Sequence, residues 1–376
     1  MRYQTFGGTG PWGSGATRGS GWASLPCWFG CTFAVCLLLL SAAGCPRPEP
    51  QVVLYCAQDQ EFATGLLDQF RQRTGLRVAP RFDTEADKSV SLYTLLVHEQ
   101  NRPRCDVFWN NEILSTIRLQ KQGLLEPYDS PAARPYPASA KAADHTWHAF
   151  ALRARVILVN TRLVKEDERP KGLLDLAGPR WRGRVAMARP QFGTSATQAA
   201  CLFEVLGGDR AKAYYRGLRK NDVQIAPGNK QVAEWVGQGR TPRGQAVAAG
   251  VTDTDDALAE VKAGRDVAII FPDRDAPAGS RMGTLFIPNT LAIIKGGPNP
   301  EGARRLVDFL LGPEAEARLA EADSHQVPLN PQVKAPLSPE IQTPKTARPM
   351  QVNWDRAAGL WNEVQSFLIQ EFARPD

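Results

Sequence analysis

Two long apolar segments, residues 150–160 and 285–294, constrain the fold of this chain more than any other feature. Each has the length and composition of a buried strand, and each lies outside the regions in which short strands alternate with helices. Such alternation implies parallel sheets with helices on both faces. Long strands placed between two α/β units predict two lobes joined by crossing strands that form a hinge. The expected fold class is therefore α/β, with two lobes and parallel-rich sheets.

The first α/β unit combines strands expected at 52–56, 76–82 and 106–109 with helices whose apolar residues recur at helical spacing. Ligands of open parallel sheets gather at the carboxyl ends of the strands. Polar side chains follow the first and third of these strands. The candidate binding residues in this unit are Gln58, Asp59, Asn111 and Glu112.

The second unit contains strands expected at 184–188, 246–251 and 266–271. The first is followed by a loop that opens a helix, where free backbone N–H groups and the helix dipole favour an anion. An ordinary serine or threonine helix cap would leave the same pattern. Asn229, which follows a Pro-Gly pair, is a further donor. The candidates here are Gly193, Thr194, Ser195, Thr197 and Asn229.

An acidic segment, Thr252–Asp256, starts the helix between the last two strands of this unit. We expect Asp253 to be a helix cap, but three Asp in four positions carry more charge than capping needs. Together with Asp59 and Glu112 across the cleft, these carboxylates would repel one another unless a cation lies between them. Oxygen ligands suit a hard metal cation, and they suit an organic amine equally. The candidates in this segment are Thr252, Asp253, Thr254 and Asp255.

The N-terminus predicts export. An apolar stretch over 33–43 is too short to span a membrane as a helix and ends in Ala42-Ala43-Gly44-Cys45, followed by three prolines within five residues. This pattern is typical of a lipoprotein signal peptide over 1–44, with lipid on Cys45 and a tether over 45–51. An ordinary secretory signal or an uncleaved anchor is the alternative. The expected location is the extracytoplasmic face of the membrane.

Three cysteines remain after removal of the signal peptide and acylation of Cys45. Cys56 ends one expected strand and Cys105 begins another, so in neighbouring parallel strands they lie too far apart to bridge. We expect these two and Cys201 to be buried free thiols. The sequence therefore predicts neither a disulfide framework nor a cysteine metal site.

Two other function classes find little support. The net charge of +6 is spread along the chain without a run of basic and aromatic residues, which argues against a nucleic-acid partner. The four histidines, at positions 98, 145, 148 and 325, lack metal-ligand spacing with the acidic segment, and no nucleophile–base pair stands out. We therefore expect a binding protein, not an enzyme.

The order of motifs resembles that of the ferric-iron-type periplasmic binding proteins, a branch of the family-1 extracellular solute-binding proteins. The spacing agrees from about Val52 to the end of the chain. The matching segments are Leu54–Asp59, Cys105–Glu112, Gly123–Leu125, Arg153–Val156, Trp181–Arg184 and Val307–Leu310. The resemblance implies a two-lobed periplasmic-binding-protein fold. Its N-terminal lobe would hold residues 52–150 plus about 286–335, and its C-terminal lobe about 156–285 plus 340–376.

The resemblance also implies ligand positions. Asp59 stands where the iron binders have a histidine, Glu112 is kept, and Thr254-Asp255 replaces their tyrosine pair. The implied metal ligands are thus Asp59, Glu112 and Asp255, with an auxiliary anion at the loop that starts with Gly193. Because Tyr214 and Tyr215 lie mid-helix one element too early, we expect both to be core residues.

Three functions stay open on the sequence alone. The first is import of a hard cation, ferric iron or similar, with an auxiliary anion. The second is import of a small zwitterion or an organic solute bearing a phosphonate or phosphate, and the remote third is a metal-dependent hydrolase. The expected partners are the membrane permease of an ABC importer and the small ligand. We expect a monomer without an obligatory cofactor, able to hold an iron ion.

Overall fold

The structure, a computed structural model, describes residues 51–83 and 90–372. The expected signal peptide, the lipidation site Cys45 and the tether up to residue 50 lie outside this part. Within it, strands and helices alternate as the sequence predicts. No helix among the described residues combines the length and the apolar character needed to cross a bilayer.

The first sheet holds the N-terminal strands. Strand β1 (Gln51–Cys56) pairs in parallel with β2 (Arg77–Phe82) and with β3 (Val107–Asn110). Strand β10 (Phe286–Ile294) runs antiparallel to β3 and to the short β4 (Leu125–Glu126). The helices of this half are α2 (Gln60–Thr74), α3 (Val90–His98), α4 (Leu114–Lys121), α9 (Pro300–Leu310) and α10 (Pro313–Glu321).

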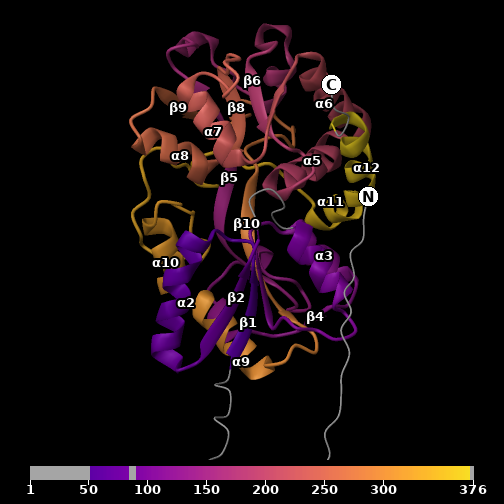
Figure 1. Cartoon of the computed structure of the whole chain (residues 1–376), viewed down its shortest axis with the longest axis vertical. Coiled ribbons are helices and arrows are strands. Elements are labelled where there is room, and N and C mark those ends of the chain that lie inside the picture. Colours follow the sequence, from indigo (N-terminus) through magenta and orange to yellow (C-terminus); the bar gives the residue numbers. More distant parts are fainter. Residues whose placement is uncertain (1–50, 84–89, 373–376) are drawn as a thin grey trace, which may run out of the picture. The chain divides into compact units, whose positions relative to one another are not determined.

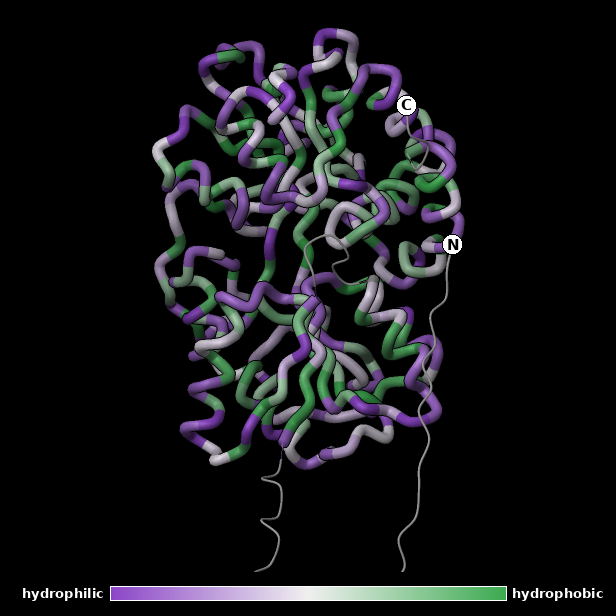
Figure 2. Tube along the Cα trace, viewed as in Figure 1, coloured by the Kyte–Doolittle hydropathy of each residue, from purple (hydrophilic) through white to green (hydrophobic). Residues whose placement is uncertain are grey.

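Helix α2 shows how the local sequence sets these elements. Its buried residues Ala63, Leu66, Leu67 and Phe70 recur at helical spacing and give it one apolar face. The helix ends at Gly75, whose φ of 72° places it in the left-handed region that glycine adopts without strain. Figure 2 shows the corresponding pattern along the chain, with hydrophobic segments concentrated in the strands and on the inner faces of the helices.

The second sheet has parallel strands at its outer side. Strand β6 (Val185–Ala188) pairs in parallel with β7 (Gln224–Ala226) and β8 (Ala249–Asp253). Strand β9 (Val267–Ile270) pairs antiparallel with the long strand β5 (His148–Asn160). The helices are α5 (Gly193–Leu206), α6 (Gly208–Lys220), α7 (Asn229–Gln238) and α8 (Thr254–Lys262). The strand expected at 246–251 lies at 249–253, because residues 240–246 form a turn closed by a bridge between Arg240 and Ala246.

One long strand belongs to both sheets. Strand β5 (His148–Asn160) pairs through residues 148–154 with β10 and through residues 155–160 with β8 and β9. Every residue of β5 is buried. Figure 1 shows β5 and β10 between the half that carries β1 and β2 and the half that carries β6 and β8. The two-lobed fold with a crossing strand is therefore confirmed, whereas the exact lobe boundaries stay a prediction.

The crossing region contains a local irregularity that side chains stabilise. Ala151 has a φ of 43°, and the register between β5 and β10 shifts between Pro288 and Asn289. The Glu316 carboxylate accepts a hydrogen bond of 2.6 Å from the Ala151 N–H, and the Asn289 amide donates one of 2.6 Å to the Ala151 carbonyl. The strained backbone thus keeps its hydrogen bonds, as buried peptide groups require.

The C-terminal helices contact both halves. Helix α11 (Trp354–Gly359) packs against α4 of the first half and α5 of the second, and α12 (Trp361–Phe372) packs against α5 and α6. Arg118 of α4 lies over the ring of Trp361, at 4.7 Å from its centroid. The end of the chain is therefore a second connection between the halves.

Three cysteines fall within the described residues, and all are free and buried. In the parallel pair of β1 and β3, Cys56 lies opposite Trp109, four residues beyond Cys105. The expectation of buried free thiols, too far apart along their strands to bridge, is confirmed.

Candidate functional site

A small polar pocket lies between the two halves, next to strand β5. It encloses about 30 Å³ accessible to the centre of a water-sized sphere, which is room for two or three water molecules at roughly 10–15 Å³ each. The lining residues are Asp59, Asn111, Arg153, Ala188, Arg189, Phe192, Gly193, Thr194, Ser195, Pro227, Gly228, Asn229, Asp253, Asp255 and Asp256.

The topology explains why these residues meet. Strands β6, β7 and β8 are parallel, and each is followed by a helix, so α5, α7 and α8 all begin at the same edge of the sheet. Gly193, Asn229 and Thr254 are the first residues of these three helices. From the other half come Asp59, which precedes α2, and Asn111, which follows β3. Free N–H groups at helix starts favour anions there.

Asp253, one of the lining residues, belongs to a buried ion pair. The Arg155 Nη1 lies 2.8 Å from the Asp253 Oδ1, and the side chains are 1% and 4% exposed. The same guanidinium donates to Thr194, Ser195, Gln198 and Asn229. The other Asp253 oxygen accepts hydrogen bonds from the Thr194 hydroxyl at 2.7 Å and the Asn229 amide at 3.1 Å. The Thr194 hydroxyl and the Asn229 amide are thus hydrogen-bonded within the protein.

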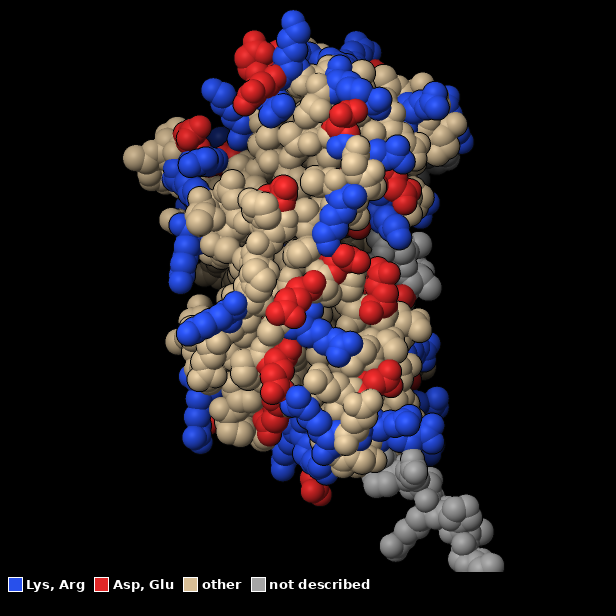
Figure 3. All heavy atoms as spheres, turned by 90° about the vertical axis from the view of Figure 1, so that its left-hand side faces the viewer, with Lys and Arg blue, Asp and Glu red and all other residues tan. Residues whose placement is uncertain are grey.

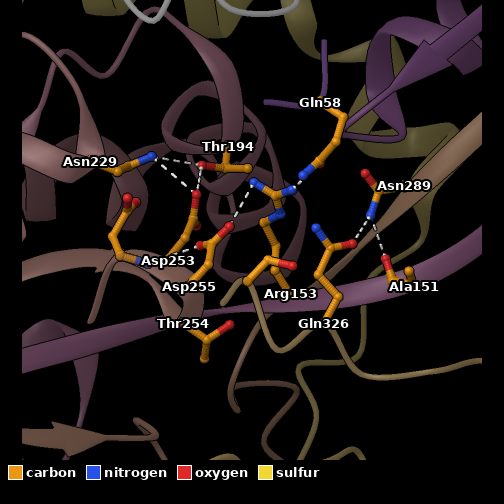
Figure 4. Close-up of polar contacts among 12 residues, drawn as sticks. Gln58, Ala151, Arg153, Thr194, Asn229, Asp253, Thr254, Asp255, Asn289 and Gln326 are labelled. Carbon is orange, nitrogen blue, oxygen red and sulfur yellow. Dashed lines mark hydrogen bonds and ion pairs between the residues drawn. The ribbon is translucent and has the colours of Figure 1, made fainter. Parts of the chain in front are cut away.

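A second arginine on the same strand face lies nearer the ligand space. The Arg153 Nη1 is 3.3 Å from the Asp255 Oδ2, and its Nη2 donates a hydrogen bond of 2.6 Å to the Gln58 Oε1 (Figure 4). Burial lowers the pKa of this guanidinium, but the carboxylates of Asp255, Asp253, Asp59 and Asp256 outweigh that effect and leave the pKa raised. Arg153 therefore stays charged in a strongly negative environment.

The acidic segment gathers three carboxylates. Asp253, Asp255 and Asp256 each place an oxygen within 4.8 Å of the others, a spacing compatible with one metal ion. Asp253 precedes α8 without capping it through its side chain, since its carboxylate is bonded to Arg155, Thr194 and Asn229 instead. The expectation that Asp253 caps the helix is therefore wrong, because the buried arginine competes for the carboxylate.

A larger open chamber adjoins this pocket and shares Asp59, Asp255 and Asp256 with it. The chamber has about 700 Å³ of space and is lined by further acids, namely Glu61, Glu234, Glu260 and Asp323, and by Lys230 and Lys262. Figure 3 shows acidic side chains, interspersed with basic ones, across the middle of one face of the molecule. The small pocket thus adjoins a chamber with more acids than bases.

A family model described as bacterial extracellular solute-binding protein matches residues 115–358. The chain belongs to this family. The major ferric iron-binding protein of Neisseria meningitidis is 26% identical to this solute-binding protein over 295 residues, covering 75% of this chain and 82% of its own. The solved structure of iron-bound HitA from Pseudomonas aeruginosa has a TM-score of 0.74 at 21% identity and covers 86% of this chain and 99% of its own. The solved structure of AfuA from Actinobacillus pleuropneumoniae with exogenous fructose-6-phosphate bound has a TM-score of 0.72 at 20% identity. The match covers 87% of this chain and 100% of AfuA.

The structure brings many of the predicted binding residues of this solute-binding protein to one pocket. Those that line it are Asp59, Asn111, Gly193, Thr194, Ser195, Asn229, Asp253 and Asp255. Those that do not line it are Gln58, Glu112, Thr197, Thr252 and Thr254. Gln58 lies behind Arg153, the Thr252 hydroxyl bonds the Asn229 carbonyl, and the Thr254 hydroxyl accepts from the Ala154 N–H.

Glu112 does not lie with Asp59 and Asp255, the other two predicted metal ligands. It is 1% exposed, and its oxygens accept hydrogen bonds from the backbone N–H groups of Leu114 and Ser115 at the start of α4. The Asn110 amide and the Thr197 hydroxyl, the latter from the opposite half, donate as well. Four donors satisfy this carboxylate inside the protein. In this conformation Glu112 joins the halves through Thr197 and does not face the pocket.

Sequence reasoning missed the arginines. Arg153 and Arg155 stand two residues apart in an otherwise apolar strand, so they point to the same face. Charged residues that interrupt a buried strand at this spacing indicate a polar cleft on that face, which is the signal that could have found them. Arg189 and Asp256 also line the pocket. By contrast, the expectation that Tyr214 and Tyr215 are core residues is confirmed, since both are buried.

Proposed function

We propose that this protein is the extracytoplasmic solute-binding component of an ABC importer, and that it captures a hard cation together with an auxiliary anion. The observation that carries the ligand assignment is the group of Asp253, Asp255 and Asp256 oxygens around a space of about 30 Å³. That space accommodates an ion, whereas pockets for organic ligands usually measure roughly 300–1,000 Å³. The iron-binding relatives support the assignment to a ferric or similar ion.

The charges in the pocket support the auxiliary anion. The pocket and the ion pair behind it hold four carboxylates, of Asp59, Asp253, Asp255 and Asp256, and three guanidinium groups, of Arg153, Arg155 and Arg189. A trivalent ion alone would exceed the remaining negative charge, so an accompanying anion brings the site closer to neutrality. The helix starts at Gly193 and Asn229 offer N–H groups to such an anion.

The metal assignment is tested by elemental analysis of the purified full chain, beside native mass spectrometry. We expect about one equivalent of iron or another hard metal, lost with chelator and regained when Fe³⁺ is added with bicarbonate. Asp255→Asn should abolish the regain, whereas Asp167→Asn, at an exposed position, should not. A metal-free protein that co-purifies with an organic acid and ignores Fe³⁺ would sink the metal assignment.

A zwitterionic or phosphate-bearing organic solute is the second candidate. A buried arginine in the pocket, Arg153, and a fold shared with a protein solved with fructose-6-phosphate favour it. Such a ligand would place its acid group near Arg153 or the α5 start and an amine near Asp256. It would also extend into the adjoining chamber, because 30 Å³ is too small for it. Titration with aminoethylphosphonate in the absence of metal tests this candidate.

We propose that lipid on Cys45 holds the protein at the extracytoplasmic face of the membrane, beside its permease. The short apolar stretch before Cys45 and the proline-rich tether support this arrangement. Cys45→Ser should release the protein from the membrane fraction without changing its melting temperature. An unchanged membrane fraction would argue for an uncleaved helix.

A further inference from the structure

Three buried N–H donors near the hinge strand have no hydrogen-bond partner among the described residues. They are the Gln58 Nε2, the Arg153 Nε and the Gln326 Nε2. Their side chains are 2%, 3% and 1% exposed. Because native proteins pair nearly all buried polar atoms, three unpaired donors in one region indicate a missing acceptor.

The three donors surround one place. The Arg153 guanidinium is hydrogen-bonded to Gln58. The antiparallel bridge between Leu152 and Val327 sets Gln326 opposite Arg153, so their side chains project on the same face. Figure 4 shows Gln58, Arg153 and Gln326 close together beside Asp255. Residues from three separate parts of the chain thus meet around the Arg153 side chain.

The acceptor oxygens of these side chains are already occupied. The Gln58 Oε1 accepts from Arg153, and the Gln326 Oε1 accepts from the Asn289 Nδ2 at 2.8 Å. Each glutamine oxygen thus already has a partner, whereas the three N–H groups have none within the described part of the chain. A water molecule accepts at most two hydrogen bonds and would leave one of the three donors unpaired, whereas an oxyanion has enough lone pairs to accept from all three.

We propose that Gln58, Arg153 and Gln326 form an oxyanion subsite on the hinge strand, distinct from the start of helix α5. The inference rests on the proposed solute-binding function and names where its acid group binds. That group is a carboxylate, carbonate, phosphate or phosphonate, either part of the solute or an auxiliary anion. The Thr194 hydroxyl of α5 and the Asn229 amide of α7 already bind the Arg155–Asp253 pair, whereas the three donors around Arg153 have no partner among the described residues.

The neighbouring carboxylate explains how cation and anion are bound together. Asp255 lies 3.3 Å from Arg153, so an oxyanion on the arginine would be next to an acidic side chain. A cation between Asp255 and the oxyanion removes that repulsion. The subsite therefore binds its oxyanion most tightly when a cation is present on the acidic segment.

The test uses Gln326→Leu and Gln58→Leu, which remove one donor each and keep the approximate side-chain volume. The full chain is titrated calorimetrically with bicarbonate, citrate or phosphate, each with and without Fe³⁺, and with aminoethylphosphonate alone. Loss of a hydrogen bond to a charged group should weaken oxyanion binding roughly 10- to 100-fold. The matched control is Gln120→Leu, because the Gln120 amide bonds Asp144 and Trp147 away from the pocket.

Melting temperatures separate misfolding from loss of the subsite. Gln326→Leu removes a buried unpaired donor, but it also removes the acceptor of one Asn289 N–H, so the apo protein should melt at a lower temperature than the wild type while remaining folded at the temperature of the titration. Oxyanion binding that requires Fe³⁺ identifies an auxiliary anion, and metal-free binding of aminoethylphosphonate identifies a solute group. Sensitivity of either to Gln326→Leu supports the subsite.

Two outcomes contradict the inference in different ways. Equal affinity of the wild type, Gln58→Leu and Gln326→Leu for every probe would assign the donors to a structural water and overturn the subsite alone. Failure of the wild type to bind any probe would overturn the proposed solute-binding function together with the subsite.

Discussion

Arg155 lies 2.8 Å from Asp253, which lines the pocket, and both side chains are almost completely buried. Removing one partner of such a pair leaves an uncompensated buried charge, which costs about 3–5 kcal/mol. We therefore expect Arg155→Met to lower the free energy of unfolding by about that amount. Urea unfolding measures it.

The matched control is Arg162→Met. Arg162 pairs with Asp266 on the surface, where the side chains are 63% and 59% exposed, and such pairs contribute about 0–1 kcal/mol. If both variants lose equally little, Asp253 is neutralised by other means and the buried pair is not a stability element.

The Arg155–Asp253 pair also shows which features the sequence predicts and which it does not. The apolar pattern of 150–160 predicted a buried strand, found at His148–Asn160, and the acidic segment predicted the start of the helix at Thr254. Both depend on local sequence. The expectation that crowded carboxylates require a cation omitted Arg153 and Arg155, although both stand in that strand. Their pairing with Asp255 and Asp253 depends on the antiparallel register of β5 and β8, which a local pattern does not specify.

Two further placements depend on contacts between distant segments. Glu112 follows its strand as expected, but local N–H groups at the start of α4 and the hydroxyl of Thr197, 85 residues later, hold its carboxylate away from the pocket. Gln326 lies opposite Arg153 only because the chain returns to β5 after α10. The helix α10 itself was not predicted. Local periodicity thus identified elements and many pocket residues, whereas tertiary pairing decided which side chains face the pocket.

A change at Asp256 should weaken ligand binding without lowering the stability of the apo protein. This residue is half-buried, and asparagine has nearly the same shape as aspartate. Asp256→Asn should therefore leave the apo melting temperature nearly unchanged. Fe³⁺ with bicarbonate at 100 times the dissociation constant should stabilise the wild type by about 2.7 kcal/mol, and a tenfold weaker variant by about 1.4 kcal/mol. Differential scanning calorimetry checks both values, and full protection of the variant would exclude Asp256 from the site.

The tyrosine pair should have no part in metal binding. Tyr215 packs against Phe367 and Phe372 of α12, and burial raises the pKa of both Tyr214 and Tyr215. A raised pKa opposes the tyrosinate form that a ferric ion binds. We expect the iron-loaded protein to lack an intense visible charge-transfer band, with Tyr214→Phe and Tyr215→Phe binding Fe³⁺ like the wild type. A strong band lost in either variant would move the metal site to this pair.

Stability should fall on acidification because of His148. Burial, helped by the nearby charges of His145 and Lys141, lowers the pKa of His148 from 6.5 to about 4. The unfolded chain therefore takes up a proton below pH 6.5, whereas the folded protein resists it down to about pH 4. The stability that the neutral imidazole provides is thus complete above pH 6.5 and decreases as the pH falls from there to 4. At pH 4.5 the loss amounts to roughly 2.5 kcal/mol.

His148→Gln removes this titration without adding a charge. Urea unfolding at pH 7 and pH 4.5 should show a smaller difference between the two pH values for the variant than for the wild type, by roughly 2.5 kcal/mol. The variant can be less stable at both pH values, so the difference between them is the quantity that decides. His98→Gln is the control, because His98 is exposed near the end of α3 and should leave the difference unchanged. An equal pH dependence in His148→Gln and the wild type would mean that His148 is charged, or relocates, in the folded protein at pH 4.5.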